Sequence, residues 1–220
     1  MPLPSIEIET APNPRHAVIW LHGLGADGHD FEPIVPELVD QAWPALRFVF
    51  PNAPVRPITI NGGMPMRAWY DISGMEIAQR QDETGIRASI GLLDELIAHE
   101  VACGVPSANI FLAGFSQGGA IVLAGGLRHA ARLGGIIALS TYLPMAEKSE
   151  AEASAANRAT PVFIAHGNFD PTIPHALGEM SRDYLKRMGY AVEWHAYAMQ
   201  HAVCADEIAD LRRWLGARFA

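Results

Sequence analysis

The chain alternates between short apolar runs and stretches in which apolar residues recur every three or four positions. Short runs of this kind are typical of buried strands, and they occupy residues 17–21, 47–50, 110–113, 135–140 and 161–166. Residues 192–198 alternate like a strand, and residues 68–72 are a further candidate. Helical spacing is found at residues 31–39, 83–102, 120–131, 175–188 and 205–219. Two segments predict no strand: residues 51–66, rich in Pro and Gly, and residues 147–160, a solvated helix or loop.

This repeated alternation of strand and helix predicts a mostly parallel sheet covered by helices on both faces. The sequence shows neither an internal repeat nor a linker. We therefore expect one α/β domain over residues 1–220. In such sheets the functional crevice lies beyond the carboxyl ends of the strands, so the residues that follow each strand are the first candidates for a functional role.

Composition narrows the class of protein. Half of the 220 residues are hydrophobic and 18% are charged, which excludes a disordered chain. The net charge of −8 without a basic face argues against nucleic acid as a partner. The two cysteines, Cys103 and Cys204, lack metal-site spacing, and we expect both to be reduced and structural. Neither a signal peptide nor an apolar run of the roughly 20 residues that span a bilayer is seen, so we expect a cytoplasmic protein without a membrane anchor.

The strand at residues 110–113 runs into a G-x-S-x-G pattern, with Ser116 between Gly114 and Gly118, and an apolar helix follows. This context is typical of a nucleophile on a sharp strand-to-helix turn, where flanking glycines let the backbones approach. The helix N-terminus also favours developing negative charge. The alternative is a glycine-rich turn in which Ser116 only caps the helix.

A serine nucleophile needs a base and a carboxylate that orients the base. Asp170 follows the strand at residues 161–166, and His201 follows the strand at residues 192–198. Taken alone, Asp170 could stabilise its own turn and His201 could be a surface or capping residue. The chain order Ser, Asp, His is nevertheless the order found in α/β-hydrolases. The sequence therefore predicts a catalytic triad of Ser116, Asp170 and His201.

A second glycine-rich segment, residues 22–28, follows the first strand. Acyl transfer needs two backbone N–H donors for the oxyanion. Gln117, directly after the nucleophile, and Leu24 in this early loop are the candidates. The segment lacks the Lys-Ser/Thr of a phosphate-binding P-loop. It does match G-x-G-x-x-G, but a dinucleotide site would leave the triad unexplained.

The chain resembles the carboxylesterase, acyl-protein thioesterase and lysophospholipase family of small α/β-hydrolases. The matching segments are LHGLGADG (21–28), PNAP (51–54), GGMPMRAWYDI (62–72), GFSQGGA (114–120), LSTYLP (139–144), HGNFDPTIP (166–174) and HAVCADEIADLRRWL (201–215). The resemblance implies an α/β-hydrolase fold, a serine esterase acting through Ser116, His201 and Asp170, oxyanion donors at Leu24 and Gln117, a homodimer, and short- to medium-chain acyl esters or thioesters as substrates. It implies no metal and no cofactor. Gln200 departs from the small residue that the family has before the histidine, which bears on the mouth of the site.

The sequence offers four candidates for contacts with the acyl chain. Met64 and Trp69 lie in an irregular stretch, residues 57–69, that could form a short flap, and methionine suits a groove accepting several chain lengths. Leu143 and Ile173 lie beside expected catalytic loops. Ordinary core or dimer packing is the alternative for each. A chain this short leaves room for only a minimal lid, which predicts an open site with broad acyl specificity.

Other readings of the scaffold remain. A peptidase on this fold would carry a cap that the chain has no room for, and a dienelactone hydrolase would have Cys where Ser116 stands. A non-enzymatic binding module is disfavoured because the three triad residues and the glycines are all present. The physiological role could be that of a lysophospholipase or a protein S-depalmitoylase, because lysophospholipids and S-acylated proteins present the same carbonyl as small esters do.

Overall fold

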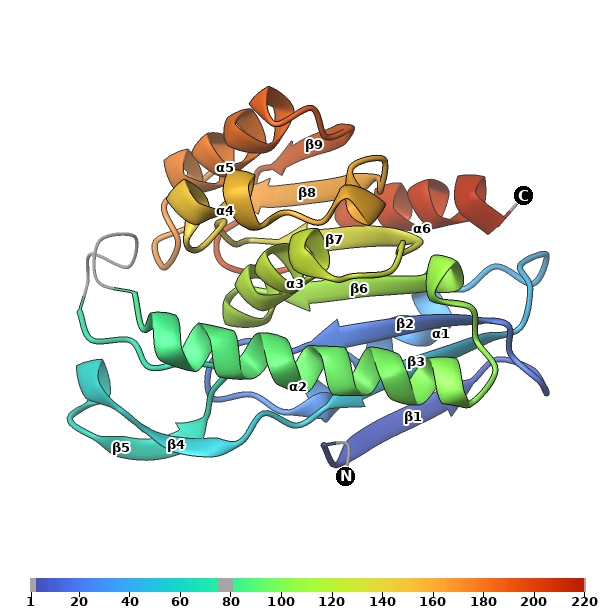
Figure 1. Ribbon diagram of the computed structural model, residues 1–220, viewed down its shortest axis with the longest axis horizontal. Helices are drawn as coiled ribbons and strands as arrows, with labels where there is room; N and C mark the ends of the chain where they lie inside the picture. The colour runs from blue at the N-terminus through green and yellow to red at the C-terminus, as the bar shows by residue number, and fades with distance from the viewer. Residues whose placement is uncertain (1–2, 75–80, 220) are drawn as a thin grey trace.

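The computed structural model describes residues 3–74 and 81–219, and its centre is a seven-stranded sheet in the order β1-β3-β2-β6-β7-β8-β9 (Figure 1). All neighbouring strands pair in parallel except β1, which is antiparallel to β3. The strands are β1 (Ser5–Glu9), β2 (His16–Leu21), β3 (Leu46–Pro51), β6 (Ile110–Phe115), β7 (Gly135–Leu139), β8 (Val162–Gly167) and β9 (Val192–Tyr197). The predicted parallel sheet is confirmed.

Helices cover both faces of this sheet, as predicted. The long α2 crosses the front of the sheet in Figure 1, and α3, α4 and α5 lie on the same side, whereas α1 and α6 lie behind. The helices are α1 (Val35–Leu38), α2 (Glu83–Ala102), α3 (Gln117–Arg128), α4 (Ala146–Glu152), α5 (His175–Arg187) and α6 (Ala205–Phe219). Two separate apolar clusters, one on each side of the sheet, form the core.

Helix α3, which follows the Ser116 turn, is buried over almost its whole length. Glycines in it allow close contact with the sheet, since a Cβ at Gly126 would lie 2.6 Å from Ile136 Cδ1. A helix held this tightly by a close-packed interior gives the turn at its N-terminus a fixed position.

Several local predictions were wrong. Residues 51–66 are not all loop, because β4 (Val55–Ile58) and β5 (Met64–Arg67) form an antiparallel hairpin. Prolines at paired positions 57 and 65 concealed it, since Pro is normally confined to edges in sheets. Residues 68–72 form no strand, and only Ile72 bridges to Gln81.

Three further segments differ from the prediction. The edge strand β1 alternates Ile with Glu but was missed among the prolines that precede and follow it. Residues 31–39 contain a 3₁₀ turn (Glu32–Ile34) and the single turn of α1 rather than one helix, with prolines at positions 33 and 36. Within residues 147–160, predicted to be solvated, Ser149 and Asn157 are buried.

The cysteines are free, as expected, but not both buried. Cys103 is exposed at the end of α2 and Cys204 is half-buried before α6. Throughout residues 3–74 and 81–219, no helix combines the length and apolarity needed to span a membrane.

Candidate active site

Ser116 lies on a sharp turn between β6 and α3 at the carboxyl edge of the sheet. Its backbone has φ 53° and ψ −119°, a conformation that costs a non-glycine residue about 1–3 kcal/mol. The glycines around it permit the turn. A Cβ on Gly118 would lie 2.3 Å from the Leu21 carbonyl oxygen, and one on Gly114 would lie 2.5 Å from the Gly118 carbonyl. The predicted reason for both glycines is thereby confirmed.

The loop that follows β7 fixes the turn from the other side. The Ser116 N–H donates to the Leu139 carbonyl at 2.9 Å. The Thr141 hydroxyl donates to the Ser116 carbonyl at 2.7 Å and is buried. Ser116 itself is 9% exposed. The strained backbone is therefore held by specific hydrogen bonds from the neighbouring strand end.

The structure brings Asp170 and His201 together. His201 Nδ1 lies 2.7 Å from Asp170 Oδ2, and because a carboxylate can only accept, Nδ1 carries the proton. The other oxygen, Oδ1, accepts the N–H groups of Thr172 at 2.8 Å and Ile173 at 2.9 Å. The Asp170 carboxylate is fully buried, while the His201 side chain keeps 17% of its surface exposed. Nε2 of His201 is thus left as the basic nitrogen.

A second histidine lies behind this pair. His166, at the end of β8, is buried, and its Nε2 donates to the Ile173 carbonyl at 2.9 Å while lying 3.4 Å from Asp170 Oδ2. Burial lowers the pKa of His166 below its usual value, so the ring stays neutral and braces the Asp170 turn. Sequence reasoning missed it, although its place at the end of a buried strand, four residues before Asp170, was a usable signal.

The two predicted oxyanion donors lie on the two loops that meet at Ser116. An ideal Cβ on Gly23 would be 3.5 Å from the Ser116 Cβ, which shows how near the β2 loop comes to the nucleophile. In the described chain, the Leu24 N–H donates to no protein acceptor. The N–H of Gln117, the first residue of α3, has no acceptor within its own helix.

A buried network ties these loops together. Gln117 Oε1 accepts the Trp69 N–H at 2.8 Å, and its Nε2 donates to the Tyr70 carbonyl at 2.7 Å. The Trp69 indole N–H donates to the His22 carbonyl at 2.9 Å. His22 in turn bonds through Nδ1 to the Gly23 carbonyl at 2.7 Å and accepts the Ala53 N–H at Nε2. Sequence reasoning missed the positioning part played by His22.

Three of the predicted acyl-contact residues, Trp69, Leu143 and Ile173, belong to one buried apolar cluster, and Met64 lies outside it. Met64 is 61% exposed on the β4–β5 hairpin. Trp69 is only 1% exposed and belongs to the network just described, beneath the surface rather than on a flap. Ile173 is buried, and its backbone holds Asp170 and His166. Leu143 lines a hollow in the described part of the structure.

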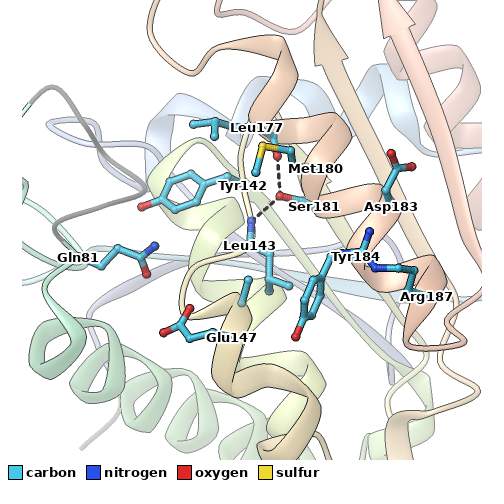
Figure 2. A pocket seen from close by; sticks show the side chains of 11 residues that line it. Gln81, Tyr142, Leu143, Glu147, Leu177, Met180, Ser181, Asp183, Tyr184 and Arg187 are labelled. Carbon is cyan, nitrogen blue, oxygen red and sulfur yellow. Dashed lines mark hydrogen bonds between the residues drawn. The ribbon is translucent and has the colours of Figure 1, made fainter.

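That hollow, of about 370 Å³, lies between the loop after β7 and helices α4 and α5 (Figure 2). Leu143, Ala146 and Leu177 form apolar parts of its wall, and Glu147 and Arg187 lie on its lining as well. The Leu143 N–H donates to the Ser181 hydroxyl, which donates to the Leu177 carbonyl, as the dashed lines in Figure 2 show. Leu143 is two residues from Thr141, so the hollow and the nucleophile turn share one loop.

The sequence and the fold are similar to those of known hydrolases. A family model described as Phospholipase/Carboxylesterase matches residues 4–218. The chain belongs to this family. Acyl-protein thioesterase 1 of Neurospora crassa is 40% identical over 215 residues, covering 93% of this chain and 88% of that protein.

Solved structures of similar proteins share the fold of this chain. The Arabidopsis thaliana protein SOBER1 superposes with a TM-score of 0.89 at 30% identity, over 94% of this chain and all of that one. Zea mays acyl-protein thioesterase 2 gives a TM-score of 0.86 at 25% identity, over 99% and 100% of the two chains. The chain is therefore a serine hydrolase with an α/β-hydrolase fold, and it cleaves acyl esters or thioesters.

Proposed function

We propose that Ser116, His201 and Asp170 are the catalytic triad of this hydrolase, with the Leu24 and Gln117 N–H groups as oxyanion donors. The observation that carries the proposal is the 2.7 Å contact between His201 and a fully buried Asp170 carboxylate, at the same sheet edge as the strained Ser116. In the first step, Ser116 Oγ attacks the acyl carbonyl and gives its proton to His201 Nε2. The oxyanion accepts from the two amides, each worth about 3 kcal/mol of barrier.

The acyl-enzyme then forms and is hydrolysed. The imidazolium returns the proton to the leaving oxygen or sulfur as the carbon–heteroatom bond breaks, which releases an alcohol or thiol. A water molecule attacks the Ser116 ester by the same route, giving a carboxylic acid and free Ser116. Asp170 stabilises the imidazolium in both halves without itself taking the proton.

The experiment compares hydrolysis of p-nitrophenyl butyrate by the parent protein and Ser116→Ala, with Ser107→Ala as a matched control, since Ser107 lies before β6 at the other end of that strand. We expect Ser116→Ala to lose at least about 10³-fold in kcat/KM and Ser107→Ala to retain the parent rate. Near-parental activity of Ser116→Ala would refute the assignment.

The hollow beside Leu143 supports a proposal for the acyl chain. Its apolar wall and its position along the Thr141 loop favour an acyl tail that leaves Ser116 toward α4 and α5. Met64 on the exposed hairpin, with Val55 and Ile60 also exposed there, would contact substrate at the mouth or a second copy of the chain. The chain-length range proposed is short to medium.

The relatives named as acyl-protein thioesterases favour the removal of acyl groups from S-acylated proteins as the physiological role. Protein S-depalmitoylation is the long-chain case of this role, and lysophospholipid hydrolysis is the second candidate. We propose that the protein carries out this role in the cytoplasm, without a membrane anchor. We also propose that it has a single domain and forms a homodimer. A panel of acyl chain lengths, each with ester and thioester leaving groups, separates the roles, and sedimentation velocity tests the dimer.

A further inference from the structure

A second hollow, of about 290 Å³, lies on the side of the site occupied by the catalytic base. Six residues line it: Asp30, Phe31, Phe115, His201, Ala202 and Val203. In the proposed mechanism His201 must deliver its proton to the departing oxygen or sulfur, so the leaving group has to lie next to the His201 ring. A hollow walled by that ring is therefore a candidate site for the leaving group.

The wall of this hollow is aromatic. The Phe115 ring packs against His201 with 4.7 Å between centroids, and Phe31 packs against Phe115 at 5.6 Å. Trp20 stacks behind Phe31 at 5.1 Å and is buried, which keeps Phe31 in place. The negative faces of such rings attract cations, above all those with an apolar envelope such as quaternary ammonium groups.

One carboxylate lies on the lining. Asp30 is exposed and ends a 3₁₀ turn in which the Asp27 side chain accepts the His29 N–H. Its neighbour Glu32 is engaged by His29 at 2.7 Å, whereas no ion pair reaches Asp30 within the described chain. Apart from His201, Asp30 is the only titratable group lining the hollow. An aromatic wall with one free carboxylate is complementary to a positive charge.

We infer that this hollow is a leaving-group subsite that selects positively charged leaving groups, with Asp30 as the residue that sets the selectivity. The inference rests on the proposed function and adds to it the charge class of the alcohol or thiol released. The overall charge of −8 acts in the same direction, since a cationic ester is drawn toward an acidic protein. Acyl-chain recognition in the hollow beside Leu143 is independent of it, because the two hollows share no lining residue.

The test compares two thioesters of equal shape. Butyrylthiocholine carries a trimethylammonium group, and S-(3,3-dimethylbutyl) thiobutyrate replaces its nitrogen by carbon. The measured quantity is the ratio of kcat/KM for the cationic ester to that for the neutral ester. Because intrinsic reactivity is the same for every variant, a change of this ratio between variants reports the protein alone.

We expect Asp30→Asn to lower the ratio about two- to fivefold, the range for one exposed charge pair, and Asp30→Lys to lower it further. Raising ionic strength should lower the ratio in the parent and have less effect in Asp30→Asn. Glu37→Gln removes an exposed carboxylate of α1 outside the hollow and should leave the ratio unchanged.

Two outcomes would overturn the inference: a ratio that is the same in the parent, Asp30→Asn and Asp30→Lys, or an equal decrease in Glu37→Gln, which would mean a general field effect. Neither bears on the triad, because hydrolysis of the neutral ester that depends on Ser116 establishes the proposed function by itself. Loss of both esters in Ser116→Ala with an unchanged ratio in the Asp30 variants would therefore refute only the subsite.

Discussion

Asp170 holds His201 with one carboxylate oxygen and its own turn with the other. Oδ2 lies 2.7 Å from His201 Nδ1, and Oδ1 accepts the N–H groups of Thr172 and Ile173. This division of the two oxygens explains why the carboxylate can be fully buried next to an imidazole without moving, and it sets the tautomer of the base.

Asp170→Asn separates these two tasks. An asparagine oxygen can still accept from Thr172 and Ile173, but the amide NH₂ faces His201 Nδ1 and favours the wrong tautomer. We expect kcat to fall about 10³- to 10⁴-fold with little change in melting temperature, measured with p-nitrophenyl butyrate and by thermal unfolding. A loss below tenfold would show that Asp170 does not orient the base.

The hollow beside Leu143 makes a prediction about chain length. Leu177→Trp puts a bulky aromatic side chain in the wall of this hollow. The acyl tail then loses space, while the reacting carbonyl does not. We expect kcat/KM for p-nitrophenyl octanoate to fall at least about tenfold, the lower end of the range for one methylene in an apolar pocket, with p-nitrophenyl acetate hardly affected. Equal losses on both esters would place the acyl chain elsewhere.

Buried histidines make stability depend on pH. Burial lowers the pKa of His22 and of His166 below the usual 6.5. As pH falls through about 6.5, these histidines become protonated in the unfolded chain but stay neutral in the folded protein. The free energy of unfolding therefore decreases, by up to about 1.4 kcal/mol per pH unit for each histidine. We expect denaturant unfolding to show this decrease between about pH 7 and 5.5.

His22→Asn removes one of these titrations, so its free energy of unfolding should fall less steeply over the same range, whatever its absolute value. His99→Asn, at an exposed position of α2, is the matched control and should keep the parent slope. A parental slope in His22→Asn would contradict the assignment of a neutral, buried His22.

Glu207 makes the free energy of unfolding change with pH in the opposite direction. It is fully buried near the start of α6, and burial raises its pKa to about 8. Between about pH 4.5 and 8 the folded protein keeps a proton that the unfolded chain has lost, so stability falls as pH rises.

Glu207→Gln should therefore unfold with a free energy that decreases less between about pH 6 and 8.5. Glu37→Gln, which removes an exposed carboxylate, serves as the control and should follow the parent. If the parent and Glu207→Gln respond equally to pH, Glu207 is ionised in the folded protein.

Much of this architecture could be predicted from the sequence, because buried parallel strands are continuous apolar runs and the chemistry follows their ends. The long helix α2 was predicted at its observed bounds for the same reason. What escaped prediction depends on contacts between distant segments. Trp69 looks like a flap residue in the sequence, yet it donates hydrogen bonds to the His22 carbonyl and to Gln117 Oε1, which makes it part of the support for the oxyanion loops.

The same limit applies to both hollows and to the hairpin. Local sequence carries no sign that Asp30 and His201, 171 positions apart, line one cavity, or that Leu143 faces α5. Prolines in both strands of the β4–β5 hairpin concealed a pairing that only their mutual register reveals.

The most direct test of the central claim, that Ser116 is the nucleophile, is to locate the adduct of a fluorophosphonate by peptide mass spectrometry. The probe traps the activated serine covalently, and His201→Ala should slow its reaction by orders of magnitude. Our account predicts stoichiometric labelling of Ser116 with parallel loss of esterase activity. Complete inactivation with the label on another residue, or full activity with Ser116 labelled, would contradict it.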